Sequence, residues 1–477
     1  MPVAQRPGRV LAIVSIAVFM ASLDLFIVNI AMPELARDFP GSGLNSLSWI
    51  LNAYAIVFAA LLVPAGRIAD RIGRRRAFVG GLALFTLASA LCGIAPSVEL
   101  LVAARVVQAV GAAFLMPTSL ALLLPAFAPE KRPVAIGVWA AVGGVAAAAG
   151  PPLGGLLVEI DWRLVFLVNV PVGIAAVVLA ARNLQEARDP EARHPDLLGT
   201  VLLIAGIGLL SLGLVQAPEW GWGDPRTLAV LAAAVVGIVS FVVHCAVGAA
   251  PVVELSMIRV RSYALANLAI LLFMTAFAAT LLANVLFLTE VWQWSVLRAG
   301  VALTPGPIFA ALFAVPGGRL AVRYGQRNVA AIGALLFAAS AASTALRMQA
   351  EPVYASVLLP AWCIGGIGVG LTLSTLSSAA ASSLPPARFA TGSAVFTMSR
   401  QVGAVLGVAI LVALLGNDSR TASAAAALHT FREGWWFIAA VAALASVAAH
   451  SIGRITLPKP VAAAVPTPES RASAAVV

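Results

Sequence analysis

Charged residues are scarce in this sequence. Only 10% of the 477 residues are Asp, Glu, Lys or Arg, whereas 61% are hydrophobic. A soluble domain carries about 25% charged residues. The supply here is too small to cover a water-facing surface, which excludes an ordinary soluble protein. The composition predicts a chain whose main solvent is the lipid bilayer.

Cysteine and histidine are also rare, and this limits the chemistry that the chain can support. The three cysteines lie in apolar stretches, and the four histidines (His194, His244, His429 and His450) are scattered. We therefore expect no disulfide framework, no metal site and no bound cofactor. The sequence also has no G-x-x-x-x-G-K-[ST] phosphate loop. These absences argue against an ATP-driven pump and against a membrane-embedded enzyme.

Long apolar stretches are what the sequence does have. A membrane helix needs about 20 mostly apolar residues, and by that measure the chain contains fourteen predicted spans. The predicted fold class is therefore an all-α polytopic membrane protein with 14 transmembrane helices. The spans are expected near residues 10–31, 47–66, 77–95, 99–124, 134–158, 163–181, 197–217, 226–249, 263–287, 299–318, 328–346, 353–380, 389–415 and 433–453.

Lysine and arginine are unevenly distributed between the loops. With the N-terminus placed inside, 21 of the 30 Lys and Arg residues fall on cytoplasmic segments, seven fall outside and two lie within spans. Positive charge of this kind marks the cytoplasmic side of a membrane protein. We expect both termini in the cytoplasm, and the net charge of +10 then requires no nucleic-acid partner. The high Ala, Gly and Arg usage indicates a bacterial source, so the expected location is the inner membrane.

A charged loop and its downstream copy indicate two related halves. GRIADRIGRRR (Gly66–Arg76) and GRLAVRYGQRN (Gly318–Asn328) match at six of eleven positions. Eight predicted spans separate them, so both lie on the same side of the membrane, as in the parallel repeats of transporters. The predicted organisation is an N-terminal six-helix bundle (1–181), a cytoplasmic linker (182–196), two inserted helices (197–249), a C-terminal six-helix bundle (250–456) and a disordered cytoplasmic tail (457–477).

Six short stretches, in order along nearly the whole chain, carry a family resemblance. They are LDLFIVNIAMPEL in span one, GRIADRIGRRR after span two, RVVQAVGAAFLMP in span four, GPPLGG ending span five, DWRLVFLVNVPVG opening span six and FTMSRQVGAVLGVAI in span thirteen. In these the chain resembles the fourteen-helix drug:proton antiporters of the major facilitator superfamily. The resemblance implies efflux by alternating access, driven by the proton gradient and without a cofactor.

Asp24 is the one acid that the predicted spans place deep in the hydrocarbon region. Ionisable residues at such depth are costly and are candidates for function. At about 1.5 Å per residue, Asp24 lies roughly 10 Å below the outer surface, and Arg105 of span four lies roughly 9 Å below it. We expect Asp24 to take up a proton and Arg105 to stabilise its deprotonated form. The alternative is a static ion pair that only fixes helix packing.

Arg400 is the other charge within a span. It lies about 16 Å up span thirteen from the cytoplasmic end, with no obvious carboxylate partner at its depth. Two interpretations stay open. Arg400 either faces a central water-filled cavity and attracts anionic groups, or it bonds backbone carbonyls at broken helices.

Span five is crowded with small residues, which let helix backbones approach closely. Two prolines near its end remove amide donors and should bend the helix. The resemblance implies that this antiporter motif marks exporters and shapes the contact between the halves, whereas a packing role alone is the alternative. Its residues are Gly150, Pro151, Gly154 and Gly155.

The charged loop after span two has two interpretations. Its arginines hold the loop in the cytoplasm, and the family pattern also implies a cytoplasmic gate. Asp70 would pair with an arginine or sit at the positive N-terminal end of a neighbouring helix. The downstream copy has Val322 in place of Asp70, so the charged contact of the gate is expected in the first half only. The expected gate residues are Gly66, Asp70, Arg71, Gly73 and Arg75.

The substrate cavity is expected near the midplane between the halves. Its candidate lining residues are polar and aromatic side chains of the spans: Phe26, Trp49, Tyr54, Gln108, Phe114, Phe277, Asn284, Glu290, Phe396 and Arg400. Glu290, near the outer end of span nine, is a candidate contact for cationic substrates. The alternative is that it is a solvent-exposed residue at the rim of the bundle.

Together with the family resemblance, these features predict proton-coupled efflux of drugs, antibiotics or similar amphipathic small molecules, and a protein that is not an enzyme. The expected partners are a small-molecule substrate, protons and the lipid bilayer, and the protein is expected to function as a monomer. The alternative functions are a proton-coupled symporter or importer, and an exporter of an endogenous metabolite or lipid. The sequence does not identify the substrate.

Overall fold

The computed structural model describes residues 6–128, 131–188, 194–248, 251–384, 389–416 and 424–453, and within them every regular element is a helix. Fourteen of these helices are long and apolar enough to cross a membrane. The predicted fold class is therefore confirmed. The predicted tail over 457–477 lies outside the described residues.

The first half contains six spans, two of which are extended or interrupted by a short element. Its elements are α1 (Pro7–Asp38), α2 (Leu44–Ile72), α3 (Arg74–Gly93), α4 (Val98–Leu123), η1 (Leu124–Ala126), α5 (Arg132–Ile160), α6 (Leu164–Leu167) and α7 (Asn169–Asn183). Several helices run past the predicted spans because polar turns continue them beyond the apolar core.

Two inserted helices and a second half follow. The inserted pair is α8 (Leu197–Trp220) and α9 (Pro225–Val247). The second half consists of α10 (Leu255–Ile258), α11 (Arg261–Leu286), η3 (Phe287–Val291), α12 (Val296–Leu303), α13 (Pro305–Tyr324), α14 (Gln326–Arg347), η4 (Tyr354–Leu358), α15 (Leu359–Ser382), α16 (Phe389–Leu415) and α17 (Ala424–His450).

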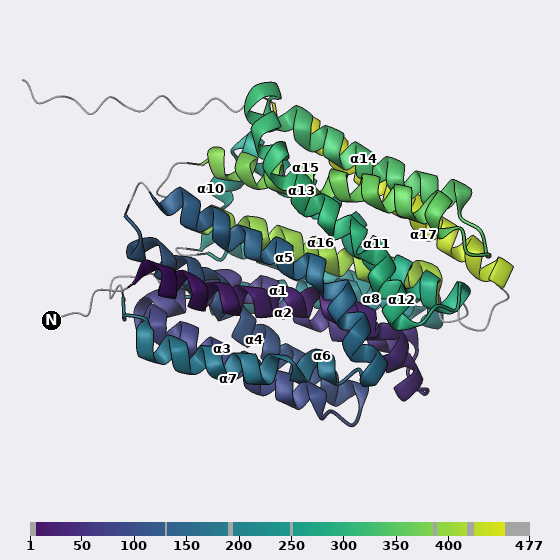
Figure 1. Cartoon of the computed structure of the whole chain (residues 1–477). Coiled ribbons are helices and arrows are strands. Elements are labelled where there is room, and N and C mark those ends of the chain that lie inside the picture. The colour runs from purple at the N-terminus through teal and green to yellow at the C-terminus, as the bar shows by residue number, and fades with distance from the viewer. Residues whose placement is uncertain are drawn as a thin grey trace, which may run out of the picture.

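The long helices run roughly side by side along one axis (Figure 1). We call the end of the bundle at which α1 begins and α17 ends the terminal face, and the other end the opposite face. Near the opposite face, one apolar cluster combines Leu23 and Leu47 of the first half with Phe273 and Trp435 of the second. The halves therefore share a core there.

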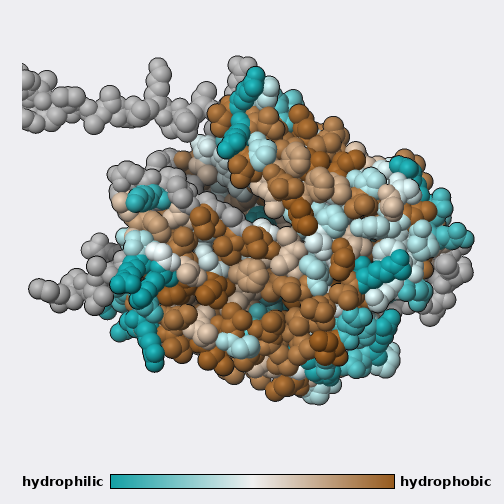
Figure 2. Space-filling model, viewed as in Figure 1, coloured by the Kyte–Doolittle hydropathy of each residue, from teal (hydrophilic) through white to brown (hydrophobic). Residues whose placement is uncertain are grey.

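The outer surface is apolar along most of the helix length. Figure 2 shows a broad hydrophobic band with hydrophilic side chains gathered toward the two ends. On α9, Val235, Val236 and Val239 are all more than half exposed, at 59%, 64% and 54%. A surface this apolar is stable only against lipid. The chain is a multi-pass membrane protein.

The inserted pair is anchored at both faces. On the opposite face, Asn45 of α2 donates hydrogen bonds to Gln216 and Glu219 of α8. On the terminal face, the Asp196 carboxylate accepts bonds from the backbone N–H of Gly199 (2.8 Å) and Val252 (3.0 Å) and contacts His244. Burial raises the pKa of Asp196, but these hydrogen bonds outweigh burial, so its pKa is lowered overall.

Candidate functional site

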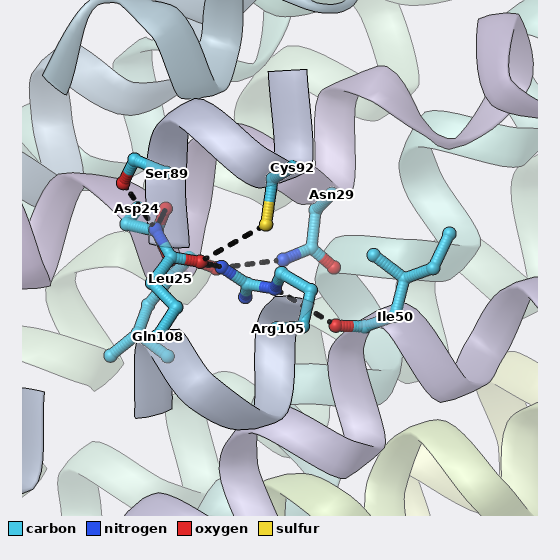
Figure 3. Close-up of polar contacts among 8 residues, drawn as sticks. All are labelled: Asp24, Leu25, Asn29, Ile50, Ser89, Cys92, Arg105 and Gln108. Carbon is cyan, nitrogen blue, oxygen red and sulfur yellow. Dashed lines mark hydrogen bonds and ion pairs between the residues drawn. The ribbon is translucent and has the colours of Figure 1, made fainter. Parts of the chain in front are cut away.

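Asp24, Arg105 and Gln108 form a buried polar cluster inside the first half (Figure 3). Arg105 Nη1 pairs with Asp24 Oδ2 and donates to Gln108 Oε1 at 2.6 Å. Gln108 Nε2 in turn donates to Asp24 Oδ1 at 2.9 Å. Asp24 and Arg105, placed at one depth by the sequence, lie in direct contact, and Gln108 bonds both of them.

The arginine is enclosed on its remaining sides. Its Nε donates to the carbonyl of Ile50 at 3.1 Å, and its guanidinium lies 4.0 Å from the ring centre of Tyr54 and 5.7 Å from that of Phe166. A cation over an aromatic face is stabilised by the ring quadrupole. Only 1% of the Arg105 side chain is exposed, so the protein supplies all of its polar contacts.

Two partners of the cluster were not anticipated from the sequence. Ser89 Oγ accepts from Gln108 Nε2 at 2.8 Å, and Cys92 lies 3.8 Å from Gln108 Oε1. Both belong to α3, a helix in which no sequence pattern singled out a functional residue. Both contact the Gln108 amide, which in turn bonds the Asp24 carboxylate.

The second half has a neutral polar group in the corresponding region. The charged loop and its copy are 252 residues apart, and the same offset relates Tyr54 to Gly306. Near Gly306, Trp362 of α15 donates to the Leu303 carbonyl at 2.6 Å and lies over Gly306. At the same offset Arg105 corresponds to Val357, so the second half has no charge at the matching position.

A small cavity beside Trp362 has a volume of about 10 Å³, room for about one water molecule. Its lining is polar but uncharged: the side chains of Thr280, Asn284, Ser340 and Thr344 face it together with apolar and aromatic groups. The only fully buried acid among the described residues is Asp24. The two halves share a fold but differ in charge at this place.

The antiporter motif lies where the halves meet near the opposite face. A Cβ on Gly155 would lie 2.8 Å from Leu297 Cα, and one on Gly300 would lie 2.3 Å from the Pro151 carbonyl oxygen. Gly150 and Gly154 instead face α1, against Phe26 and Ile27. The small residues of α5 therefore bring its backbone against α12 of the second half.

The charged loop between α2 and α3 contacts α4, α7 and the linker that follows α7. Asp70 pairs with Arg74 of the same loop at 2.7 Å. Arg71 lies against the imidazole of His194, and Arg75 donates to the carbonyl of Ala181. Gly66 packs on Pro117 of α4. Of the two contacts expected for Asp70, the arginine pair is present.

A different carboxylate occupies the N-terminal end of α3. Glu186 accepts hydrogen bonds from the backbone N–H of Arg75 (3.0 Å) and Arg76 (3.2 Å). Glu186 also lies very close to Gly73, whose φ is +115°. A Cβ added to Gly73 would be 2.5 Å from Glu186 Oε1. The charged composition of the linker is plain in the sequence, but no sequence pattern gave Glu186 this role.

The expected cavity residues are spread over several environments. Tyr54 and Gln108 belong to the Asp24 cluster, and Asn284 lines the small cavity of the second half. The others do not converge with them on one described cavity. Phe26 packs over Gly150, and Phe114 packs on Gly81 of α3. Both Trp49 and Phe396 join an apolar cluster around α2 and α16, whereas Phe277 packs on Phe337. Glu290 lies in η3, and Arg400 lies partly buried on α16.

A family model described as the Major Facilitator Superfamily matches residues 14–265 and 265–475. The chain belongs to this superfamily. Among curated members, the chain is 34% identical to the tetracenomycin C resistance and export protein of Streptomyces glaucescens, with 86% of this chain and 76% of that protein covered. It is 32% identical to the methylenomycin A resistance protein of Bacillus subtilis (84% and 86% covered).

Solved structures of the superfamily share the fold. A bacterial homologue of the human lysosomal transporter Spinster, in an inward-facing and unoccupied conformation, superposes with a TM-score of 0.65 at 16% identity, over 94% of this chain and 96% of that chain. The superfamily consists of transporters, and the relatives named above support a place among its drug-efflux members.

Proposed function

We propose that the protein exports amphipathic small molecules, antibiotics among them, in exchange for protons. The observation that carries the proposal is the Asp24–Arg105–Gln108 cluster, a single carboxylate held between a guanidinium and an amide away from water. A buried ion pair adds little net stability compared with well-packed apolar side chains, so packing alone is a weak reason for this one. A carboxylate in such a pair is well suited to bind and release a proton as its pairing changes.

The geometry suggests how the exchange would work. While Arg105 touches Asp24, the opposite charge favours the deprotonated carboxylate. If movement of α4 against α1 separates the pair, burial favours the neutral, protonated acid. Gln108 can bond the carboxyl group in both states because its amide both donates and accepts. Proton affinity would then follow the conformation of the carrier.

The direction and location of transport are part of the proposal. Export is supported by the antiporter motif at Gly150–Gly155 and by relatives named for resistance and export. The charge bias of the loops supports a bacterial inner membrane with both termini in the cytoplasm. The terminal face would then be cytoplasmic, and the protein would act as a monomer without a cofactor.

Everted membrane vesicles with an imposed pH gradient test the exchange. Tetracenomycin C and methylenomycin A, after which the relatives are named, are the first probes. We expect a transported probe to dissipate the gradient in wild-type vesicles and to leave it intact with Asp24→Asn. Asp224→Asn removes a carboxylate from a loop and should behave as wild type. Export without any proton movement would contradict the proposal.

A further inference from the structure

Charge deep within the spans is not balanced. Asp24, Arg105 and Arg400 are the charges that the sequence places deep in the membrane, and each lies at least seven positions inside both ends of a described span. Asp24 and Arg105 neutralise one another in a direct ion pair. Of these three, Arg400 is therefore left as an uncompensated positive charge.

Arg400 has no partner among the residues that the structure describes. Its Nε is buried without a hydrogen-bond partner, and the guanidinium forms no ion pair or ring contact with them. A charged group inside a membrane ordinarily pairs with an opposite charge or with backbone carbonyls. The described helices provide neither, so the interpretation that Arg400 bonds backbone carbonyls at broken helices finds no support.

The packing of α16 shows that Arg400 lies off the face that meets α11. Ser399 donates to Asn267 of α11 at 3.0 Å, and Cβ atoms on Gly403 and Gly407 would lie 2.3 and 2.2 Å from α11 carbonyl oxygens. These three positions, four residues apart, form the face toward α11. Arg400 follows Ser399 by one residue, about 100° around the helix. Arg400 therefore does not take part in the α11 contact. The other neighbours of α16 are α2 of the first half, α8 of the inserted pair, α15 and α17.

Two side-chain amides on α16 and α2 are also unsatisfied. Gln401 Nε2, on the next residue of α16, is buried without a partner, and on α2 both the Nδ2 and the Oδ1 of Asn52 are buried without one. Buried donors that lack acceptors carry a desolvation cost that a bound acceptor group removes. On α16 and α2, which pack against each other across the halves, a guanidinium N–H and two amide N–H groups therefore lack an acceptor.

We propose that Arg400 is the counter-charge for an anionic group of the substrate, so that the transported compounds are amphipathic acids carrying a carboxylate or phenolate. The planar guanidinium can bond such a group through two parallel N–H donors. An organic cation would meet an unpaired positive charge at mid-depth and bind less well. This substrate class rests on the proposed efflux function.

Fluorescein and rhodamine 123 share a xanthene scaffold and differ in charge, which makes them a matched pair of probes. We expect the purified full-length protein to bind fluorescein, measured by tryptophan quenching, at least tenfold more tightly than rhodamine 123. Losing a hydrogen bond to a charged group costs roughly ten- to hundredfold in affinity. Arg400→Gln should therefore weaken fluorescein binding by about that factor, with Arg400→Lys in between, and should leave rhodamine 123 unweakened.

Controls separate a specific effect from a general one. Arg226→Gln removes an arginine whose side chain is 70% exposed and should bind both dyes as wild type. Equal binding of the two dyes, no fluorescein binding up to millimolar concentration, or a parallel loss of both in a folded Arg400→Gln protein would each overturn the assignment of Arg400. Binding does not depend on proton exchange, so the vesicle assay with Asp24→Asn can fail or succeed independently.

Discussion

Tyr54 shows how a single residue supports the buried charge pair. Its ring lies 4.0 Å from the Arg105 guanidinium, while its hydroxyl is buried and has no hydrogen-bond partner in the described chain. A desolvated cation–π contact is worth about 2 kcal/mol, whereas an unsatisfied hydroxyl is a cost. The ring, and not the hydroxyl, is the part of Tyr54 that the cluster uses.

Two substitutions of Tyr54 separate these contributions. We expect Tyr54→Phe to keep wild-type efflux and an equal or higher melting temperature, because it removes only the unpaired hydroxyl. Tyr54→Ala should lower both, since Arg105 loses its aromatic cover and a cavity remains. Vesicle efflux and thermal unfolding of the purified protein measure the two effects. Loss of proton coupling in Tyr54→Phe would instead assign the hydroxyl a part in proton transfer.

At the scale of elements, the linker after α7 completes the first turn of α3. Helix N-termini leave backbone N–H groups without partners, and the N-cap residue of α3 is Gly73, which has no side chain to satisfy them. Glu186 supplies the missing acceptor from 110 residues away. The charged loop and the linker thus form one structural unit.

We expect Glu186→Ala to loosen this unit without unfolding the bundle. Loss of a helix cap costs about 1 kcal/mol, which should raise hydrogen exchange at the amides of Arg75 and Arg76 several-fold. Glu159→Ala, at the far end of α5, is the matched control. Unchanged protection of both amides would show that the contact with Glu186 contributes nothing to the helix end.

At the scale of the whole molecule, the halves meet through glycines near the opposite face. A Cβ on Gly155 would lie 2.8 Å from the backbone of α12, whereas one on Gly144 of the same helix would have nothing within 4 Å. A large residue at position 155 cannot be accommodated unless the halves separate there. The small residues of α5 therefore control how closely this end can close.

This pair of glycines allows a controlled test. Gly155→Leu should lengthen the distance between spin labels placed at Glu159 and Arg298, on either side of the contact, and should slow efflux. Gly144→Leu has open space around it and should leave the distance unchanged. Electron paramagnetic resonance of the labelled protein in liposomes measures both. A label distance in Gly155→Leu that is no longer than in the wild type would contradict the packing of α5 against α12.

The sequence predicted much of this arrangement where simple rules apply. Apolar length located the spans, and helix rise placed Asp24 and Arg105 at one depth, where they pair. The facing of side chains around each helix was beyond those rules, so the sequence did not show that Phe114 packs on Gly81 while Asn284 lines the small cavity of the second half. Glu186 was missed because its partner lies far away in sequence. Trp362 was missed because no sequence pattern marks an indole that bonds a distant backbone carbonyl.

With Asp24 as the proposed proton carrier, one carboxylate would carry one proton per transport cycle. Substrate-driven proton release from the purified, weakly buffered protein tests this most directly, using a compound that the vesicle assay shows to be exported. We predict release of about one proton per wild-type molecule and none from Asp24→Asn, with substrate binding retained. Full proton release from Asp24→Asn would contradict the account.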